Sequence, residues 1–167
     1  MKNFLLLIPL LFAFAATAQT NEYYYAGELD IKAGASVFVT GPGTAETEYG
    51  YTVETVYWQT IHTGTGLELG DNHFQRGVVT TLNYSAVTEY YRITPWPQTR
   101  FFNRFDIYSK TAAETWYDDG SKGATIGGGI DFAFTKKAGL NLDFAQHFDS
   151  IADKTGEGLK LSFAVKF

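Results

Sequence analysis

Leu159-Lys160-Leu161-Ser162-Phe163-Ala164-Val165-Lys166-Phe167 decides the fold, because apolar residues alternate in it with small or charged ones up to the last position. Successive side chains of a β-strand point to opposite faces. One face of the predicted strand therefore carries Leu159, Leu161, Phe163, Val165 and Phe167. The other face carries Lys160, Ser162, Ala164 and Lys166. The stretch predicts a two-faced strand that ends on an aromatic residue.

The first 18 residues are typical of a secretory signal peptide. Lys2 supplies the positive start, an apolar run follows from Phe4 to Ala16, and Ala16-Thr17-Ala18 fits the small-x-small cleavage pattern. A membrane anchor is the alternative, but a spanning helix needs roughly 20 apolar residues and this run is shorter. We therefore expect residues 1–18 to be cleaved and residues 19–167 to form one domain.

The composition limits how the domain can be stabilised and what it can bind. There is no cysteine, so an exported chain of this kind must be stabilised by a core or a closed sheet rather than by disulfides. The formal net charge is −5, and no basic cluster is present, which argues against a nucleic-acid partner. An aromatic content of 17% and 17 glycines suit twisted strands better than helices.

Eight segments alternate with a period of two, and no segment has a helical period. We expect strands near residues 28–39, 49–58, 61–70, 78–92, 101–110, 125–134, 140–148 and 159–167. The boundaries between Tyr49 and Gly70 are the least defined, since both faces of residues 49–58 carry apolar side chains. In the fourth segment, the alternation from Val78 places Tyr84 and Ala86 outward, Glu89 inward and Arg92 at the interface.

The charges fall on the face opposite the aliphatic rows. On this phase they are Glu28, Asp30, Lys32, Glu54, Glu68, Glu89, Arg104, Asp106, Lys110, Asp131, Asp143, Lys160 and Lys166. Phe167 at the end, aromatic clusters near strand ends and the lack of disulfides favour an all-β fold, an eight-stranded antiparallel up-and-down transmembrane β-barrel. A soluble lipocalin-like barrel that binds an apolar ligand is the alternative, with the apolar face inside.

A barrel of eight strands is just wide enough for side chains to fill it. The inward charges therefore predict a packed network of ion pairs rather than a pore. We assign to it Arg104, Asp106, Asp131, Asp143, Lys160 and Lys166. Arg104 with Asp106, and Lys160 with Asp143, are the expected partners.

The mature chain resembles the small eight-stranded outer-membrane barrels of the OmpX and OmpA transmembrane-domain type. Its most specific part is the row Leu159, Leu161, Phe163, Val165 and Phe167, which resembles the C-terminal signal of the outer-membrane assembly machinery. The Ala18-Gln19 junction resembles those of Bacteroidota. The resemblance implies a monomer in the outer membrane of a Gram-negative cell, in contact with lipids and lipopolysaccharide. It also implies periplasmic termini and extracellular loops at residues 41–46, 71–76, 117–123 and 149–158.

Little in the sequence indicates catalysis. His62, His73 and His147 are dispersed without metal-ligand spacing, and we expect no metal and no cofactor. The segment Gln146-His147-Phe148-Asp149-Ser150 loosely resembles the active site of PagL-type lipid A deacylases, which gives the alternative of a lipid A-modifying hydrolase that uses His147, Ser150 and Glu157. That family places serine two residues after histidine, whereas Phe148 and Asp149 intervene here. The main prediction is a non-catalytic barrel with a structural or surface-interaction role through its loops.

Overall fold

The described residues of the computed structural model are 23–40, 47–71, 84–93, 102–117, 122–149 and 155–167. They form eight strands: β1 (Leu29–Thr40), β2 (Thr47–Trp58), β3 (Thr63–Asp71), β4 (Tyr84–Ile93), β5 (Phe105–Trp116), β6 (Lys122–Thr135), β7 (Ala138–Asp149) and β8 (Thr155–Lys166). One short 3₁₀ turn, η2 (Phe102–Arg104), precedes β5. None of the helical structure described is long and apolar enough to cross a membrane.

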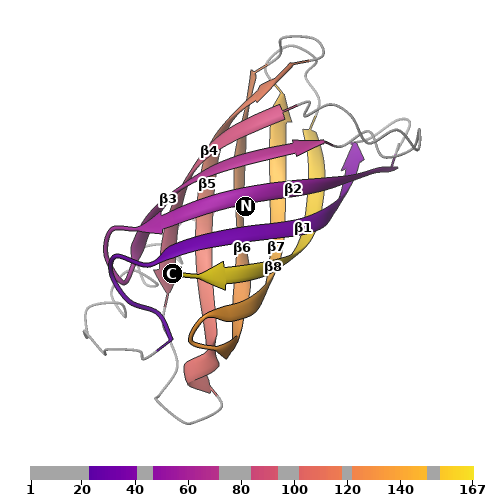
Figure 1. Cartoon of the computed structure of the whole chain (residues 1–167). Coiled ribbons are helices and arrows are strands. Elements are labelled where there is room, and N and C mark those ends of the chain that lie inside the picture. The colour runs from indigo at the N-terminus through magenta and orange to yellow at the C-terminus, as the bar shows by residue number, and fades with distance from the viewer. Residues whose placement is uncertain (1–22, 41–46, 72–83, 94–101, 118–121, 150–154) are drawn as a thin grey trace, which may run out of the picture.

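The strands close into a barrel (Figure 1). Each strand pairs antiparallel with the next, and β8 pairs antiparallel with β1. Both described ends of the chain, Tyr23 and Phe167, lie at the same rim, because Phe167 and Leu29 exchange backbone hydrogen bonds at the start of β1. The predicted fold is confirmed: an eight-stranded antiparallel closed barrel. Closure leaves no edge strand with unpaired backbone groups.

The register determines how steeply the strands tilt. A row of paired residues starts at Leu29 on β1 and returns to β1 at Val39, ten residues further along. It runs through Tyr57, Thr65, Glu89, Thr111, Ile126, Gln146 and Glu157. A stagger of this size tilts the strands by about 40° and leaves an interior that side chains fill.

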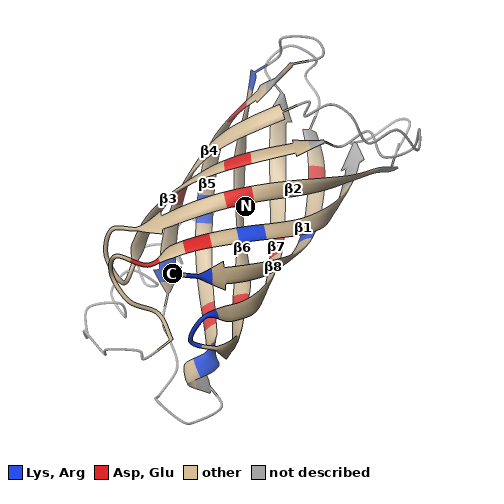
Figure 2. Ribbon diagram, in the orientation of Figure 1, with Lys and Arg blue, Asp and Glu red and all other residues tan. Residues whose placement is uncertain are grey.

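The two faces of the sheet are chemically opposite. Figure 2 shows Lys, Arg, Asp and Glu distributed along the strands, and most of those side chains are buried inside the barrel. Large apolar side chains point outward, and Leu161 and Phe144 are 53% and 54% exposed. A lipocalin-like barrel needs the reverse arrangement, an apolar interior and a charged exterior. The lipocalin-like arrangement is therefore wrong for this fold.

Strand β4 has the opposite phase to the one expected. Tyr84, Ala86 and Arg92 are buried inside the barrel, whereas Glu89 is exposed on the outside. The expectation took its phase from the stretch starting at Val78, which lies outside the described residues, while the strand itself begins at Tyr84. A slip of one residue moves every side chain to the other face. Arg92 is thus an interior residue rather than an interfacial one.

Gly127 lies where β6 packs closely against β7. A Cβ atom at this position would lie 2.3 Å from the carbonyl oxygen of Phe144 and 2.8 Å from Cα of Ala145. These are backbone atoms of the neighbouring strand, so they cannot rotate away as a side chain would. Glycine in a strand commonly marks such a close approach.

We expect Gly127→Val to lower the free energy of unfolding by about 1–3 kcal/mol, because the added methyl groups push β6 from β7. The measurement is the urea midpoint in detergent micelles. Ala124→Val is the matched control, since Ala124 is exposed on the outer face of the same strand. Equal midpoints for the two variants would show that the close approach does not constrain the barrel.

Candidate functional site

The barrel interior concentrates charge, with eight carboxylates and five basic side chains among the described residues. The carboxylates are Glu28, Asp30, Glu54, Glu68, Asp106, Glu114, Asp131 and Asp143. The basic side chains are Lys32, Arg92, Lys110, Lys160 and Lys166. They reach the interior because alternate residues of every strand point inward. Burying a charge is unfavourable unless it is paired, so the pairing determines whether this interior is stable.

Arg92 is the centre of a cluster near the rim where the chain ends lie. This rim cluster consists of Arg92, Glu28, Asp30, Asp106 and Trp58. The Nη2 atom of Arg92 lies 2.6 Å from Oε1 of Glu28 and 3.6 Å from Oδ2 of Asp30. Its Nε atom lies 3.0 Å from Oδ2 of Asp106. The guanidinium also stacks on Trp58, 3.4 Å from the ring centroid. One cation therefore pairs with carboxylates from two parts of the barrel wall, the start of β1 and the start of β5.

Tyr24 closes the barrel at this rim. The chain turns at Gly27, whose φ of 83° suits glycine, and the Gly27 amide donates to the carbonyl of Trp58. This turn leads the chain back over the rim, where the Tyr24 hydroxyl donates to the carbonyls of Arg104 and Asp131 at 2.9 and 3.3 Å. Arg92 and Lys166 lie over its ring. Burial raises the pKa of the Tyr24 phenol, so the hydroxyl keeps the proton that it donates.

Lys160 is the centre of a second cluster, in the middle of the barrel. Its Nζ atom lies 2.7 Å from Glu68, 3.2 Å from Glu54 and 3.3 Å from Asp143. Lys110 lies 3.2 Å from Asp143. Buried tyrosines complete the hydrogen bonding: Tyr84 donates to Glu68, Tyr90 to Glu54 and Tyr108 to Asp143.

Lys32 lies between the two clusters. Its Nζ atom is buried and makes no hydrogen bond to the described residues. It lies instead 5.0 Å and 5.2 Å from the ring centroids of Tyr90 and Tyr108. These distances are typical of cation–π contacts, which stabilise a desolvated ammonium group without a direct ion pair.

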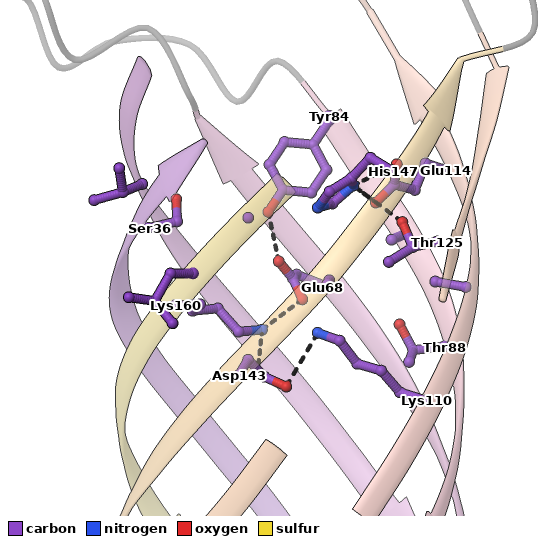
Figure 3. A pocket seen from close by; sticks show the side chains of 16 residues that line it. Ser36, Glu68, Tyr84, Thr88, Lys110, Glu114, Thr125, Asp143, His147 and Lys160 are labelled. Carbon is purple, nitrogen blue, oxygen red and sulfur yellow. Dashed lines mark hydrogen bonds and ion pairs between the residues drawn. The ribbon is translucent and has the colours of Figure 1, made fainter. Parts of the chain in front are cut away.

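A small cavity lies inside the barrel, toward the rim opposite the chain ends (Figure 3). Its volume is about 40 Å³, room for a few water molecules. His147 lies on its wall, with Nδ1 2.8 and 3.0 Å from the Glu114 oxygens and 3.0 Å from Oγ1 of Thr125. Lys110, Lys160, Glu68 and Asp143 lie deeper along the same cavity. The cavity thus reaches the ion pairs around Lys160, and the charged side chains of the described interior are almost fully buried.

Two of the three residues expected to form a hydrolase site, His147 and Glu157, lie on opposite faces of the sheet. His147 points inward, and its carboxylate partner is Glu114 from β5. Glu157 pairs in register with Gln146, the residue before His147, so it points to the outer face and is exposed. Ser150 lies outside the described residues. Among the described residues no group of three or more histidines and carboxylates is arranged to hold a metal ion.

The structure places five of the six expected network residues in the barrel interior: Asp106, Asp131, Asp143, Lys160 and Lys166. Lys160 and Asp143 are paired as described above. Arg104 is the exception, because it lies in η2 before β5 begins and so falls outside the strand alternation. It is half-buried and donates to the carbonyl of Phe134 at 3.3 Å. Arg92 takes its expected place beside Asp106.

Sequence reasoning missed two charged members of the interior, Arg92 and Glu114. Arg92 was assigned to the interface instead of the interior, because the phase expected for β4 was wrong. Glu114 lies eight residues after Asp106, in the same phase, and extending the fifth strand beyond Lys110 would have found it. The signal for Glu114 was therefore in the sequence, while the signal for Arg92 depended on knowing where β4 begins.

No protein-family model matches the chain, and no curated protein matches it. Solved structures do match. The Neisserial surface protein A superposes with a TM-score of 0.60 at 12% identity, over 84% of this chain and 99% of that one. The fold is that of the small transmembrane β-barrels. A de novo designed transmembrane β-barrel gives a TM-score of 0.59 at 13% identity, over 90% of this chain and 100% of that one. Outer membrane protein OprG of Pseudomonas aeruginosa gives 0.54 at 12% identity, over 89% and 99%.

Proposed function

We propose that the chain is an outer-membrane barrel with a packed polar interior, whose role is structural or is carried by its extracellular loops, without catalysis. This proposal rests on the arrangement of the two faces, which is the reverse of that in a soluble barrel: charged side chains are enclosed and apolar side chains are exposed around the barrel. A water-facing surface of this kind would be an aggregation hazard. In a bilayer the same surface is favourable, since lipid-facing strand positions are apolar and enclosed ones are polar.

The height of the apolar surface supports a membrane location. Ten residues of a strand tilted by about 40° rise about 25 Å, which is the height of the apolar band in outer-membrane barrels. Aromatic side chains lie outward near both limits of this height. Near the rim with the chain ends they are Tyr57, Tyr91, Phe105, Phe134 and Phe167, and near the other rim Tyr49, Tyr117 and Phe148. Aromatic girdles at these levels are typical of membrane barrels.

The outward row of β8 supports contact with the assembly machinery. Leu159, Leu161, Phe163 and Phe167 are all exposed, and Val165 lies in the same row. A partner can therefore read this row without opening the barrel. On the proposed topology the chain ends face the periplasm. The opposite rim, where β1, β3, β5 and β7 end, then faces the cell exterior and the lipopolysaccharide.

The proposal is tested by membrane fractionation and by heat-modifiable migration on SDS gels. We expect the protein to sediment with outer membranes, to resist carbonate extraction and to migrate differently before and after boiling. We also expect the mature chain to begin at Gln19. The urea-unfolded chain should fold into liposomes, because the lipid tails there solvate the apolar outer face. Release by carbonate would exclude an integral membrane barrel.

A further inference from the structure

One wall of the barrel differs from the rest of the outer surface. Across β3, β4 and β5 the outward residues include Thr65, Glu89, Ser109 and Thr111, which we call the polar strip. Ala113, also exposed, continues the row of small residues on β5. Beside the polar strip the same wall exposes the apolar side chains of Leu67 and Val87. The opposite wall, on β7, β8 and β1, exposes more large apolar side chains: Leu142, Phe144, Leu159, Leu161, Phe163, Leu29 and Ile31.

Glu89 lies within the apolar belt rather than at its edge. In the row of paired residues that starts at Leu29 on β1, Glu89 is reached after three steps from strand to strand. The row climbs the full height of the belt in eight such steps. This places it roughly 9 Å above the level of Leu29, about a third of the way up the belt. Its carboxylate is exposed on the outer face and therefore faces lipid in an isolated barrel.

The polar strip only partly satisfies this carboxylate. The Thr65 hydroxyl lies 3.1 and 3.2 Å from the two Glu89 oxygens, but it has one proton to donate. Gln59 in turn donates to Thr65 at 2.7 Å. An ionised carboxylate offers about four acceptor positions, so further donors are needed in a medium without water.

In membranes, small and hydroxyl-bearing side chains mark contacts between protein segments, because they allow backbones to approach and supply hydrogen bonds. Ser109, Thr111 and Ala113 form such a surface directly beside Glu89. Glu89 and Thr111 are paired in register, so they lie at nearly the same height. The polar strip thus carries an acceptor on one strand and donors on the next.

We propose that the polar strip is the contact between two copies of this chain in the membrane, a proposal that rests on the membrane barrel proposed above. A two-fold axis along the membrane normal, passing between β4 and β5, sets β4 of one copy against β5 of the other. Each Glu89 then faces the hydroxyls of Ser109 and Thr111 of its partner rather than the other Glu89. Such a contact is self-complementary, as a two-fold interface requires. The chain is then a dimer rather than the monomer expected from its sequence.

The absence of cysteine allows a clean cross-linking test. Ala113→Cys places one thiol beside the polar strip without removing any of its hydroxyls, and Leu159→Cys places one at a similar height on the opposite wall. Each protein is folded into liposomes at low protein density and treated with a short bismaleimide. We expect a cross-linked dimer from Ala113→Cys and monomer from Leu159→Cys. Glu89→Leu, added to Ala113→Cys, should weaken dimerisation by roughly threefold to tenfold, since the interfacial hydrogen bonds are lost.

Heat-modifiable migration of each variant shows whether it has folded, and Glu89→Gln is the milder replacement if Glu89→Leu does not fold. Equal cross-linking at both cysteines, or none at Ala113→Cys in a folded barrel, would refute the dimer. So would capture of a different membrane protein by Ala113→Cys in whole cells when the purified protein does not link to itself. A wild-type chain that never becomes heat-modifiable would instead contradict the membrane barrel.

Discussion

Arg92→Leu is expected to lower the free energy of unfolding by about 3–5 kcal/mol, because it removes the cation of a buried ionic group and leaves its partners charged. Arg92 pairs with Glu28 and Asp106 and stacks on Trp58, and none of its side chain is exposed. Leucine restores neither the charge nor the stacking. The urea midpoint of the heat-modifiable band in liposomes measures the loss.

Arg104→Leu is the control for this variant. Arg104 is half-buried in η2 and its side chain donates to one backbone carbonyl. Its replacement should change the midpoint little, although both variants lose one positive charge. A similar loss for the two variants would mean that net charge, and not the rim cluster, sets the stability.

Leu161→Arg is expected to destabilise the protein by about 2–4 kcal/mol, because it places a charge on the lipid face near the middle of the bilayer. Leu161 is 53% exposed on β8 and lies in the centre of that strand. In water the same substitution on an exposed position would cost little. The variant therefore measures the surroundings of the outer face as well as the stability of the barrel.

Glu157→Arg is the matched control on the same strand and the same face. Glu157 lies seven strands along the climbing row, near the rim opposite the chain ends. An arginine at an interface costs only about 0–1 kcal/mol. Equal urea midpoints for Leu161→Arg and Glu157→Arg would contradict a bilayer around β8.

Much of this fold follows from alternation alone. On β8 the inward and outward rows are those that the terminal stretch predicts, because an amphipathic strand fixes both its face and its register. On β6 and β7 the same holds: Asp131 and Asp143 are inside, and Ile130 and Leu142 are outside. These strands carry one chemically consistent row on each face, so the pattern has one solution.

The errors arise where that condition fails. Strand β4 has tyrosine on both faces, Tyr90 inside and Tyr91 outside, so composition does not distinguish them. Its inward tyrosines donate to carboxylates of β3, the neighbouring strand, and of β2, the strand beyond it, and these contacts leave no mark in the sequence of β4 itself. Arg104 was misassigned because a 3₁₀ turn breaks the period of two, and the sequence carries no marker of that turn.

Several ion pairs of the interior join residues that are distant along the chain. Arg92 and Glu28 are 64 residues apart, Lys160 is 92 and 106 residues from Glu68 and Glu54, and Lys166 is 138 residues from Glu28. No hairpin of consecutive strands contains both partners of any of these pairs. While β8 and β1 are apart, the charged face is an open, hydrated cleft that lipid cannot solvate. Water therefore leaves the interior in the same step in which β8 pairs with β1. That step comes late in folding and is cooperative.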